Sequence, residues 1–172
     1  MTQQSPGRAA VLVHPCVQRV RDALAAHQIT AEVTVLDGAA RTAAQAAAYL
    51  GISSAQIASS LVFAARARPD SPAEPLLVLT SGAHRVDTTK VADLLELAEV
   101  GQADAEFVRS RTGFVIGGVA PVGHTNAVRT LIDVSLARYE TVWAAAGHPH
   151  AVFPTTYEEL LRMCGGQPIE VT

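Results

Sequence analysis

Two apolar segments, 60–65 and 75–80, follow each other along the chain with no helical segment between them. The connection, 66–74, is polar and holds two prolines. Strands joined so closely pair antiparallel, because a parallel pair needs a crossover of about a dozen residues or more. A purely parallel sheet is therefore excluded. Together with the helical segments below, the pair predicts an α/β fold, a single domain over 1–172 with a mixed, largely antiparallel β-sheet and surrounding helices.

Apolar periodicity and local cap or turn signals predict the other elements. The predicted helices are 15–28, 42–50, 88–97, 104–110 and 156–164, with a helical turn at 54–57. The further predicted strands are 31–36, 114–116, 130–132, 141–145, 151–153 and 168–171. Asp87 and Asp104 are expected to cap helices, and Thr155 with Glu158 fits a capping box before the last helix.

Composition narrows the class of protein. The chain is 49% hydrophobic and 17% charged, which favours a globular fold over disorder. No apolar run approaches the roughly 20 residues of a membrane helix, and no signal peptide is evident, so a cytoplasmic protein without a membrane partner is expected. The net charge of −3 argues against a general nucleic-acid coat protein. It leaves open a protein that grips only the end of an RNA.

The most informative local motif for a functional site is TGFVIGGVAPVGH at 112–124. Paired glycines after a short apolar run let backbone N–H groups turn toward a ligand. Pro121 stiffens such a loop, and His124 adds a titratable group at its exit. The segment therefore indicates either a pocket lined by backbone or a tight loop with glycines at positive φ and a surface histidine.

Other polar groups stand at expected strand ends or loops. They are Ser59, Ser60, the segment 81–85 with His84 and Arg85, and Asp133. Asp133 follows an apolar pair, so a buried carboxylate that needs partners is one interpretation and a turn or cap residue is the other. His148 and His150 have no acidic or thiol partner at a ligand spacing, and Cys16 and Cys164 form neither metal spacing nor disulfide framework, so no metal and no cofactor is expected.

Taken in order, seven segments resemble the YbaK and prolyl-tRNA-synthetase-associated domain family, which includes free-standing aminoacyl-tRNA deacylases. They are HPCVQRV at 14–20, RTAAQAA at 41–47, QIASSLVF at 56–63, SGAHRVD at 81–87, TGFVIGGVAPVGH at 112–124, TLID at 130–133 and VWAAAG at 142–147. The resemblance spans nearly the whole chain. It implies a trans-editing hydrolase that cleaves the ester between a wrong amino acid and the 3′ end of a tRNA.

The resemblance also implies site residues and partners. The glycine-and-proline loop of the family matches Gly117, Gly118 and Pro121, whose backbone would position the aminoacyl carbonyl and terminal ribose. Together with the polar groups named above, the expected catalytic residues are Ser59, Gly117, Gly118 and Asp133, and the expected substrate-binding residues are Ser60, His84, Arg85, Pro121 and His124. The implied partner is the 3′ end of an aminoacyl-tRNA, with an aminoacyl-tRNA synthetase as a further candidate.

Two positions depart from the family pattern. Ala31 precedes Glu32 and Val33, where the family has a tyrosine, and the more serious departure is at Ser59. The family carries a functional lysine in a segment like QIxKSLVF, and this chain has Ser59 there. A serine can hydrogen-bond but supplies no charge, and His84 or Arg85 is the expected substitute. Three alternatives stay open: a divergent deacylase, a deacylase of altered specificity, and a non-catalytic module that binds a tRNA end or a small molecule. An enzyme is expected to have one pocket joining Ser59, the paired glycines, His124 and Asp133.

Overall fold

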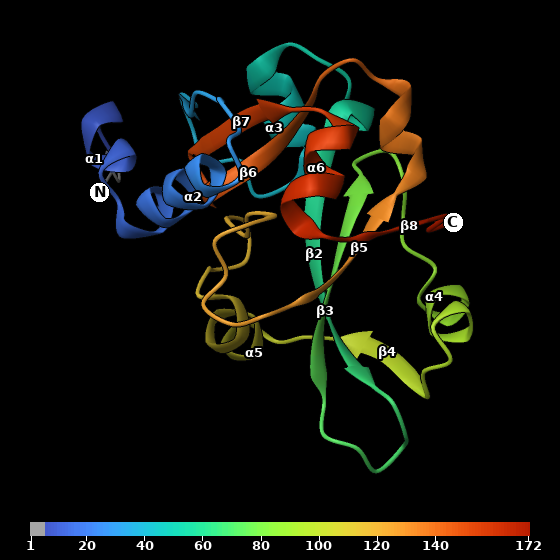
Figure 1. The fold of residues 1–172 in the computed structure, drawn as a ribbon. Helices are drawn as coiled ribbons and strands as arrows, with labels where there is room; N and C mark the ends of the chain where they lie inside the picture. The colour runs from blue at the N-terminus through green and yellow to red at the C-terminus, as the bar shows by residue number, and fades with distance from the viewer. Residues whose placement is uncertain (1–5) are drawn as a thin grey trace.

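The computed structural model describes residues 6–172, which fold around one eight-stranded sheet (Figure 1). The strands are β1 Thr34–Val35, β2 Ile57–Arg66, β3 Glu74–Ser81, β4 Glu99–Gln102, β5 Arg129–Asp133, β6 Val142–His148, β7 Ala151–Thr155 and β8 Gln167–Ile169. The helices are α1 Arg8–Leu12, α2 Pro15–Ala26, α3 Ala43–Leu50, α4 Thr88–Leu94, α5 Ala105–Thr112 and α6 Tyr157–Cys164, with short 3₁₀ helices η1 Ser54–Gln56 and η2 Val134–Arg138.

The sheet is mixed, as the sequence predicts. Its order is β1-β7-β6-β2-β3-β5-β8, with β4 paired to β2 off this path. β2 and β3 are antiparallel neighbours from Ala58 opposite Ser81 to Ala65 opposite Glu74, which confirms the opening prediction. The pairs β1·β7, β2·β4 and β6·β7 are also antiparallel, whereas β2·β6, β3·β5 and β5·β8 are parallel.

One edge of β2 is interrupted. On the edge away from β3, β2 pairs with β6 at Ile57 and Ala58, and with β4 from Phe63 to Arg66. Within the described residues, no strand pairs with 59–62 along that edge. Peptide groups there need other partners, because an unpaired backbone group away from water is costly. This interruption is the feature of the sheet that creates a site.

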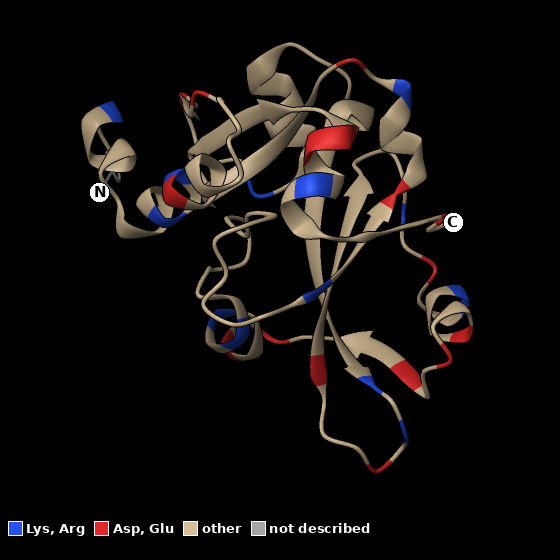
Figure 2. Cartoon of the chain, viewed as in Figure 1, with Lys and Arg blue, Asp and Glu red and all other residues tan. Residues whose placement is uncertain are grey.

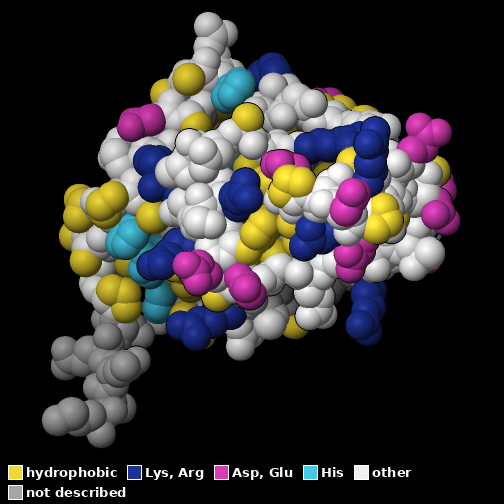
Figure 3. All heavy atoms as spheres, turned by 90° about the horizontal axis from the view of Figure 1, so that it is seen from below, with side chains coloured by type: hydrophobic (Ala, Val, Ile, Leu, Met, Phe, Trp, Pro, Cys, Tyr) yellow, Lys and Arg dark blue, Asp and Glu magenta, His cyan; other side chains and the backbone are white. Residues whose placement is uncertain are grey.

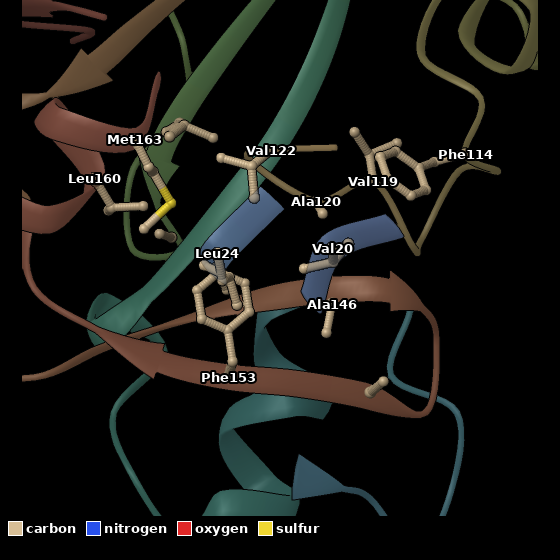
Figure 4. Packing of buried hydrophobic residues seen from close by; sticks show 14 of the residues in the cluster. Val20, Leu24, Phe114, Val119, Ala120, Val122, Ala146, Phe153, Leu160 and Met163 are labelled. Carbon is tan, nitrogen blue, oxygen red and sulfur yellow. The ribbon is translucent and has the colours of Figure 1, made fainter. Parts of the chain in front are cut away.

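The sheet is buried on both faces, because β3 is apolar at successive positions. Leu77 and Leu79 face a core that contains α2 and α6, whereas Leu76 and Val78 face a second core beside α4. In the first core, Val20 of α2 and Phe153 of β7 pack with side chains from the 113–124 loop (Figure 4). The loop thus forms part of the core layer.

The predicted strand at 114–116 is wrong. Phe114 is buried, whereas Val115 and Ile116 are 51% and 56% exposed, which does not follow strand alternation. The Gly118 N–H donates to the Val115 carbonyl at 3.0 Å and closes a turn. The apolar run was misleading because its side chains divide between the core and the outer surface of a loop.

Other differences concern element ends. Only Thr34 and Val35 of the predicted strand 31–36 pair in the sheet. The last helix is capped one residue later than expected, because the Thr156 hydroxyl accepts from the Glu159 N–H. The sequence also missed α1 and β4, both of which are short. The caps at Asp87 and Asp104 are confirmed, each accepting a backbone N–H from three residues ahead.

Candidate active site

A pocket of about 350 Å³ opens beside the interrupted edge of β2. Its walls come from β2, β6, the turn after α5 and the segment that leads into α3. The residues that line it are Ala40, Arg41, Thr42, Ala43, Ala46, Ile57, Ala58, Ser59, Ser60, Leu61, Ile116, Gly117, Val119, Trp143, Ala144, Ala145, His148, Pro149, Ala151 and Val152. We call this hollow the edge pocket.

Ser59 and Ser60 both line the edge pocket, from adjacent positions of β2. Side chains alternate along a strand, so Ser60 shares the face of Ala58 and Val62, which pack in the core with α2. The Ser60 hydroxyl oxygen is buried and has no hydrogen-bond partner, the single such side-chain atom in residues 6–172. A buried hydroxyl without a partner is costly, which indicates that a ligand or water satisfies it.

Gly117 forms the opposite wall with backbone. It is the third residue of the turn closed by Val115 and Gly118, and its φ of +92° is one that L side chains rarely adopt. A Cβ at this position would lie 3.2 Å from the Cγ of Arg41. Features of both alternatives that the sequence left open occur together here, because Gly117 has positive φ in a tight turn and also lines the hollow. The glycine allows Arg41 to approach it closely.

Gly118 does not line the edge pocket. Its N–H is used within the turn, and a Cβ at Gly118 would lie 3.2 Å from the Cα and N of His148. Those atoms belong to backbone that cannot move aside easily. Gly118 therefore seats the turn against the end of β6, and any part it has in catalysis is through the position of Gly117.

Arg19 of α2 ties both ends of the loop together. Its Nη2 donates to the Gly113 carbonyl at 2.8 Å, and its Nε donates to the Gly123 carbonyl at 3.2 Å. Its guanidinium carbon lies 4.6 Å from the centre of the Phe114 ring. Arg19 was not singled out from the sequence, because its partners are nearly a hundred residues away.

Pro121 and His124 lie outside the edge pocket, contrary to expectation. The His124 Nε2 donates to the Ala120 carbonyl at 2.7 Å, and its ring packs edge-on against Phe114. Burial lowers the pKa of His124, so the neutral ring is favoured. The Pro121 carbonyl accepts from the Cys164 thiol, whose pKa burial raises to about 12. These contacts hold the loop in place, and none of the three residues lines the hollow.

Asp133 belongs to a separate polar cluster. β3 lies between β2 and β5, so by strand spacing Asp133 is about 10 Å from β2. Its carboxylate accepts from the Ser81 N–H at 3.0 Å and from the Ser135 hydroxyl at 2.7 Å, and the His84 Nδ1 lies 2.8 Å away. Burial alone would raise the pKa of Asp133, but these hydrogen bonds, led by Ser135, hold it below its ordinary value.

The expected single pocket is therefore not formed. It was to join Ser59 and the glycines with His124 and Asp133, and neither of the last two lines the hollow. His84 is held at Asp133, and Arg85 is exposed and does not line the hollow either. Sequence spacing could not separate these groups, because it contains no information on which strand lies between them.

Arg41 brings positive charge to the edge pocket instead, and His148 adds a titratable imidazole. Arg41 is exposed at the rim and His148 is half-buried. The His148 ring centre lies 5.2 Å from that of His14 and 5.5 Å from that of His150. Burial lowers the pKa of His148, and repulsion from the two neighbouring imidazoles lowers it further. An anion at the mouth of the pocket would offset this repulsion.

Basic side chains are not gathered on one element (Figure 2). They are spread over helices, strands and loops, with acidic groups between them. One face nevertheless brings histidines together with hydrophobic and basic side chains (Figure 3). No cluster of three or more His, Cys, Asp or Glu suited to a metal ion occurs within 6–172. Over the same range, no helix has the length and apolarity needed to cross a bilayer.

Comparison with known proteins points to one family. The sequence model of the aminoacyl-tRNA editing domain matches residues 37–163. A crystal structure of a proposed trans-editing enzyme for prolyl tRNA synthetase superposes with a TM-score of 0.81 at 37% identity, over 93% of this chain and 98% of that one.

Two relatives extend the comparison. The uncharacterized protein YwhH of Bacillus subtilis is 31% identical over 129 residues, which cover 75% of this chain and 78% of YwhH. The proline–tRNA ligase of Bacillus licheniformis is 35% identical over 107 residues, which cover 62% of this chain and 17% of the ligase. The similarity to the ligase thus concerns a small part of that enzyme.

Proposed function

Because this chain belongs to the aminoacyl-tRNA editing domain family, we propose that it is a trans-editing hydrolase. It would cleave the ester that joins a wrong amino acid to the 3′ end of a tRNA. Its partner would be the aminoacyl-tRNA 3′ end. The names of two relatives make the tRNA for proline the first to test.

The observation that carries this proposal is the composition of the edge pocket. Both of its walls, β2 with Ser59 and Ser60 and the turn at Gly117, lie within the matched stretch 37–163. A hollow lined by unpaired backbone of β2 and by the hydroxyls of Ser59 and Ser60 suits a neutral, polar group such as an ester beside a ribose. Its volume of about 350 Å³ falls in the range of small-molecule sites.

Hydrolysis of an aminoacyl ester needs few catalytic groups from the protein. Water attacks the ester carbonyl, the bond to the ribose oxygen breaks, and the products are the free amino acid and the 3′ hydroxyl. An aminoacyl ester is already activated, so orientation of the ester and stabilisation of the developing oxyanion supply much of the acceleration. In this proposal Ser59, Ser60 and the backbone at Gly117 hold the ester, and the vicinal ribose hydroxyl assists the water.

Arg41 takes the place of the family lysine in this proposal. Ser59 supplies no charge, and Arg41 reaches the same hollow from the segment before α3. A guanidinium at the rim suits a phosphate of the tRNA end, because it binds phosphate oxygens through two parallel hydrogen bonds. Asp133 would act at a distance, through the position of Ser81 and the end of β3.

The experiment measures kcat/KM for hydrolysis of mischarged tRNA by the full chain and by point variants. Arg41→Ala is expected to lose about tenfold or more, the value of a charged hydrogen bond. The control is Arg162→Ala, an exposed arginine on α6 outside the pocket. Equal activity of both variants and the wild type would remove Arg41 from the site.

Ser59 is tested separately. If Ser59 positions the ester, Ser59→Ala loses much less than the roughly 100-fold expected of a group that moves a proton. Ser59→Lys should then raise turnover by restoring a charge. A loss of about 100-fold or more in Ser59→Ala would show instead that this hydroxyl directs the water.

A further inference from the structure

One arginine on α2 holds both ends of the loop that carries Gly117. The carbonyls of Gly113 and Gly123 stand at opposite ends of this loop, and both accept from the guanidinium of Arg19, at 2.8 and 3.2 Å. Both hydrogen bonds are charge-assisted, which makes them roughly twice as strong as bonds between neutral groups. Because a guanidinium is planar and rigid, it also fixes the separation of the two carbonyls.

The glycines at the two ends of the loop fit closely against Arg19. Gly113 and Gly123 have φ values of +79° and +81°, which L side chains rarely adopt. A Cβ at Gly113 would lie 2.7 Å from the Nη2 of Arg19, and a Cβ at Gly123 would lie 3.2 Å from the Arg19 carbonyl oxygen. A side chain at either glycine would therefore displace the arginine or the helix that carries it.

The helix α2 gives Arg19 a firm base. Val17 and Val20, on the same helix, are fully buried in the core, and Phe114, whose ring the guanidinium covers, is 1% exposed. The helix spans Pro15–Ala26, which lies outside the stretch 37–163 that the family model matches. Arg19 is therefore a residue that acts on the matched domain from outside it.

The middle of the loop depends on how its ends are held. Gly117 lies in the turn that the Gly118 N–H closes with the Val115 carbonyl, and the side chains of Val115 and Ile116 are half exposed. Such side chains contribute little packing that would fix the turn. The place of Gly117 at the edge pocket therefore follows from the anchored ends and from the contact of Gly118 with β6.

Resting on the function proposed above, we propose that Arg19 is a positioning residue for the hydrolysis. Arg19 does not line the edge pocket. It fixes the ends of the loop, and the loop sets the place of the Gly117 backbone opposite Ser59 and Ser60. A displacement of about 1 Å in a site that orients its substrate can cost roughly 100-fold in rate. Arg19 thus acts on catalysis through a wall of the site.

The test compares kcat and KM of Arg19→Met with those of the wild type, on mischarged tRNA and well below the unfolding temperature of either protein. Methionine keeps an unbranched stem and a good helix propensity but has no donor. We expect kcat to fall roughly 10- to 100-fold while KM changes by less than about threefold, because a displaced wall orients the ester less well in the transition state.

Arg21→Met is the matched control. Arg21 also lies on α2, and it donates to a single backbone carbonyl, that of Leu12, at 3.3 Å. It lines no part of the edge pocket. The kcat of Arg21→Met should therefore equal that of the wild type.

His124 reports the position of the guanidinium independently of activity. Burial lowers the pKa of His124 most, the hydrogen bond to the Ala120 carbonyl raises it, and repulsion from Arg19 lowers it. Titration followed by NMR should give a higher pKa of His124 in Arg19→Met and no change in Arg21→Met. Arg19→Lys keeps the charge without the planar fork, so the pKa of His124 should stay low while kcat lies between those of the wild type and Arg19→Met.

A wild-type kcat in folded Arg19→Met would overturn this inference and leave the hydrolase in place. An equal fall of kcat in Arg19→Met and Arg21→Met, or a pKa of His124 that does not respond to Arg19→Met, would overturn it as well. If Arg19→Met does not fold, Arg19→Lys takes its place, and a wild-type kcat there has the same consequence. No hydrolysis by the wild type would overturn the proposed function and, with it, the role of Arg19.

Discussion

Ser59 and Ser60 are neighbours on β2 but meet different surroundings. From the sequence, Ser59 is the notable residue, because it occupies the position of the family lysine. From the structure, Ser60 is the notable residue, because its buried hydroxyl has no partner in residues 6–172 and it lines the edge pocket and a second, adjacent hollow. A family comparison detects a residue that has changed, whereas burial detects a polar group that lacks a partner. The two serines therefore call for separate variants.

Gly117 gives the first prediction at this scale. Gly117→Ala places a Cβ at φ +92° and 3.2 Å from Arg41. We expect the free energy of unfolding to fall by about 1–2 kcal/mol, the cost of a left-handed conformation. Turnover of mischarged tRNA should fall by roughly 10- to 100-fold, because the wall of the site shifts.

The matched control is Gly165→Ala at the end of α6. Gly165 also has positive φ, at +57°, and a Cβ there would contact nothing within 4 Å. A similar loss of stability with unchanged turnover is expected. Equal loss of turnover in the two variants would mean that strain alone, and not the pocket wall, is responsible. Thermal or urea unfolding and kcat/KM are measured on both.

Asp133 gives a pH prediction. Its pKa in the folded chain is lower than in the unfolded chain, so its carboxylate stabilises the fold above the unfolded pKa. That contribution is lost as the pH falls through the folded pKa. Asp133→Asn should lower the free energy of unfolding by about 1–3 kcal/mol at neutral pH, because buried N–H donors lose their acceptor.

The measurement is urea unfolding of both proteins between neutral pH and pH 3. The difference between wild type and Asp133→Asn should shrink as the pH falls below the ordinary carboxyl pKa of 3.8. His124 and His148 also have lowered pKa values and destabilise both proteins in acid, so only the difference isolates Asp133. A difference that stays constant or grows in acid would contradict the assignment.

At the scale of elements, the sequence predicted the features that depend on neighbouring residues, namely a short strand connection, helix caps and helix ends. The β2–β3 pair, the caps at Asp87 and Asp104, and the helix ends at Gly51 and Gly165 are confirmed. The segment 114–116 was wrong because its conformation depends on tertiary contacts. Arg19 donates hydrogen bonds to both ends of that loop. The local sequence preference of 114–116 cannot reveal a contact with a residue so distant in the chain.

Gly118 gives a prediction about how elements pack. The sequence placed Gly118 among the expected catalytic residues, in the backbone wall of the pocket. In the structure, Gly118 packs against the backbone of His148 and Gly147. A valine side chain at this position would therefore push the loop away from β6. We expect the free energy of unfolding of Gly118→Val to fall by about 1–3 kcal/mol, as in an overpacked core.

The control for Gly118→Val is Gly7→Val. A Cβ at Gly7 meets no atom within 4 Å, and its φ of −63° suits any residue. Its free energy of unfolding should stay within about 0.5 kcal/mol of the wild type. Full stability of Gly118→Val would show that the turn does not rest on β6 as described.

At the scale of the whole molecule, the site arises from the sheet order. β6 covers the start of β2 and β4 covers its end, so a short stretch of β2 stays unpaired between them. Fold class could be predicted from short connections and apolar patterns. The unpaired stretch of β2 could not be predicted, because it depends on where the pairing with β4 and β6 ends. Arg41 and His148 were therefore overlooked as site residues, although both segments were examined.

The hydrolase proposal is tested by the rate at which the purified chain releases amino acids from mischarged tRNA for proline. We expect acceleration over spontaneous ester hydrolysis for at least one amino acid, and loss of most of that acceleration in Gly117→Ala but not in Gly165→Ala. Binding of the tRNA without acceleration across the amino acids tested would contradict hydrolysis and favour a binding module. Neither binding nor acceleration would contradict any role at the tRNA 3′ end.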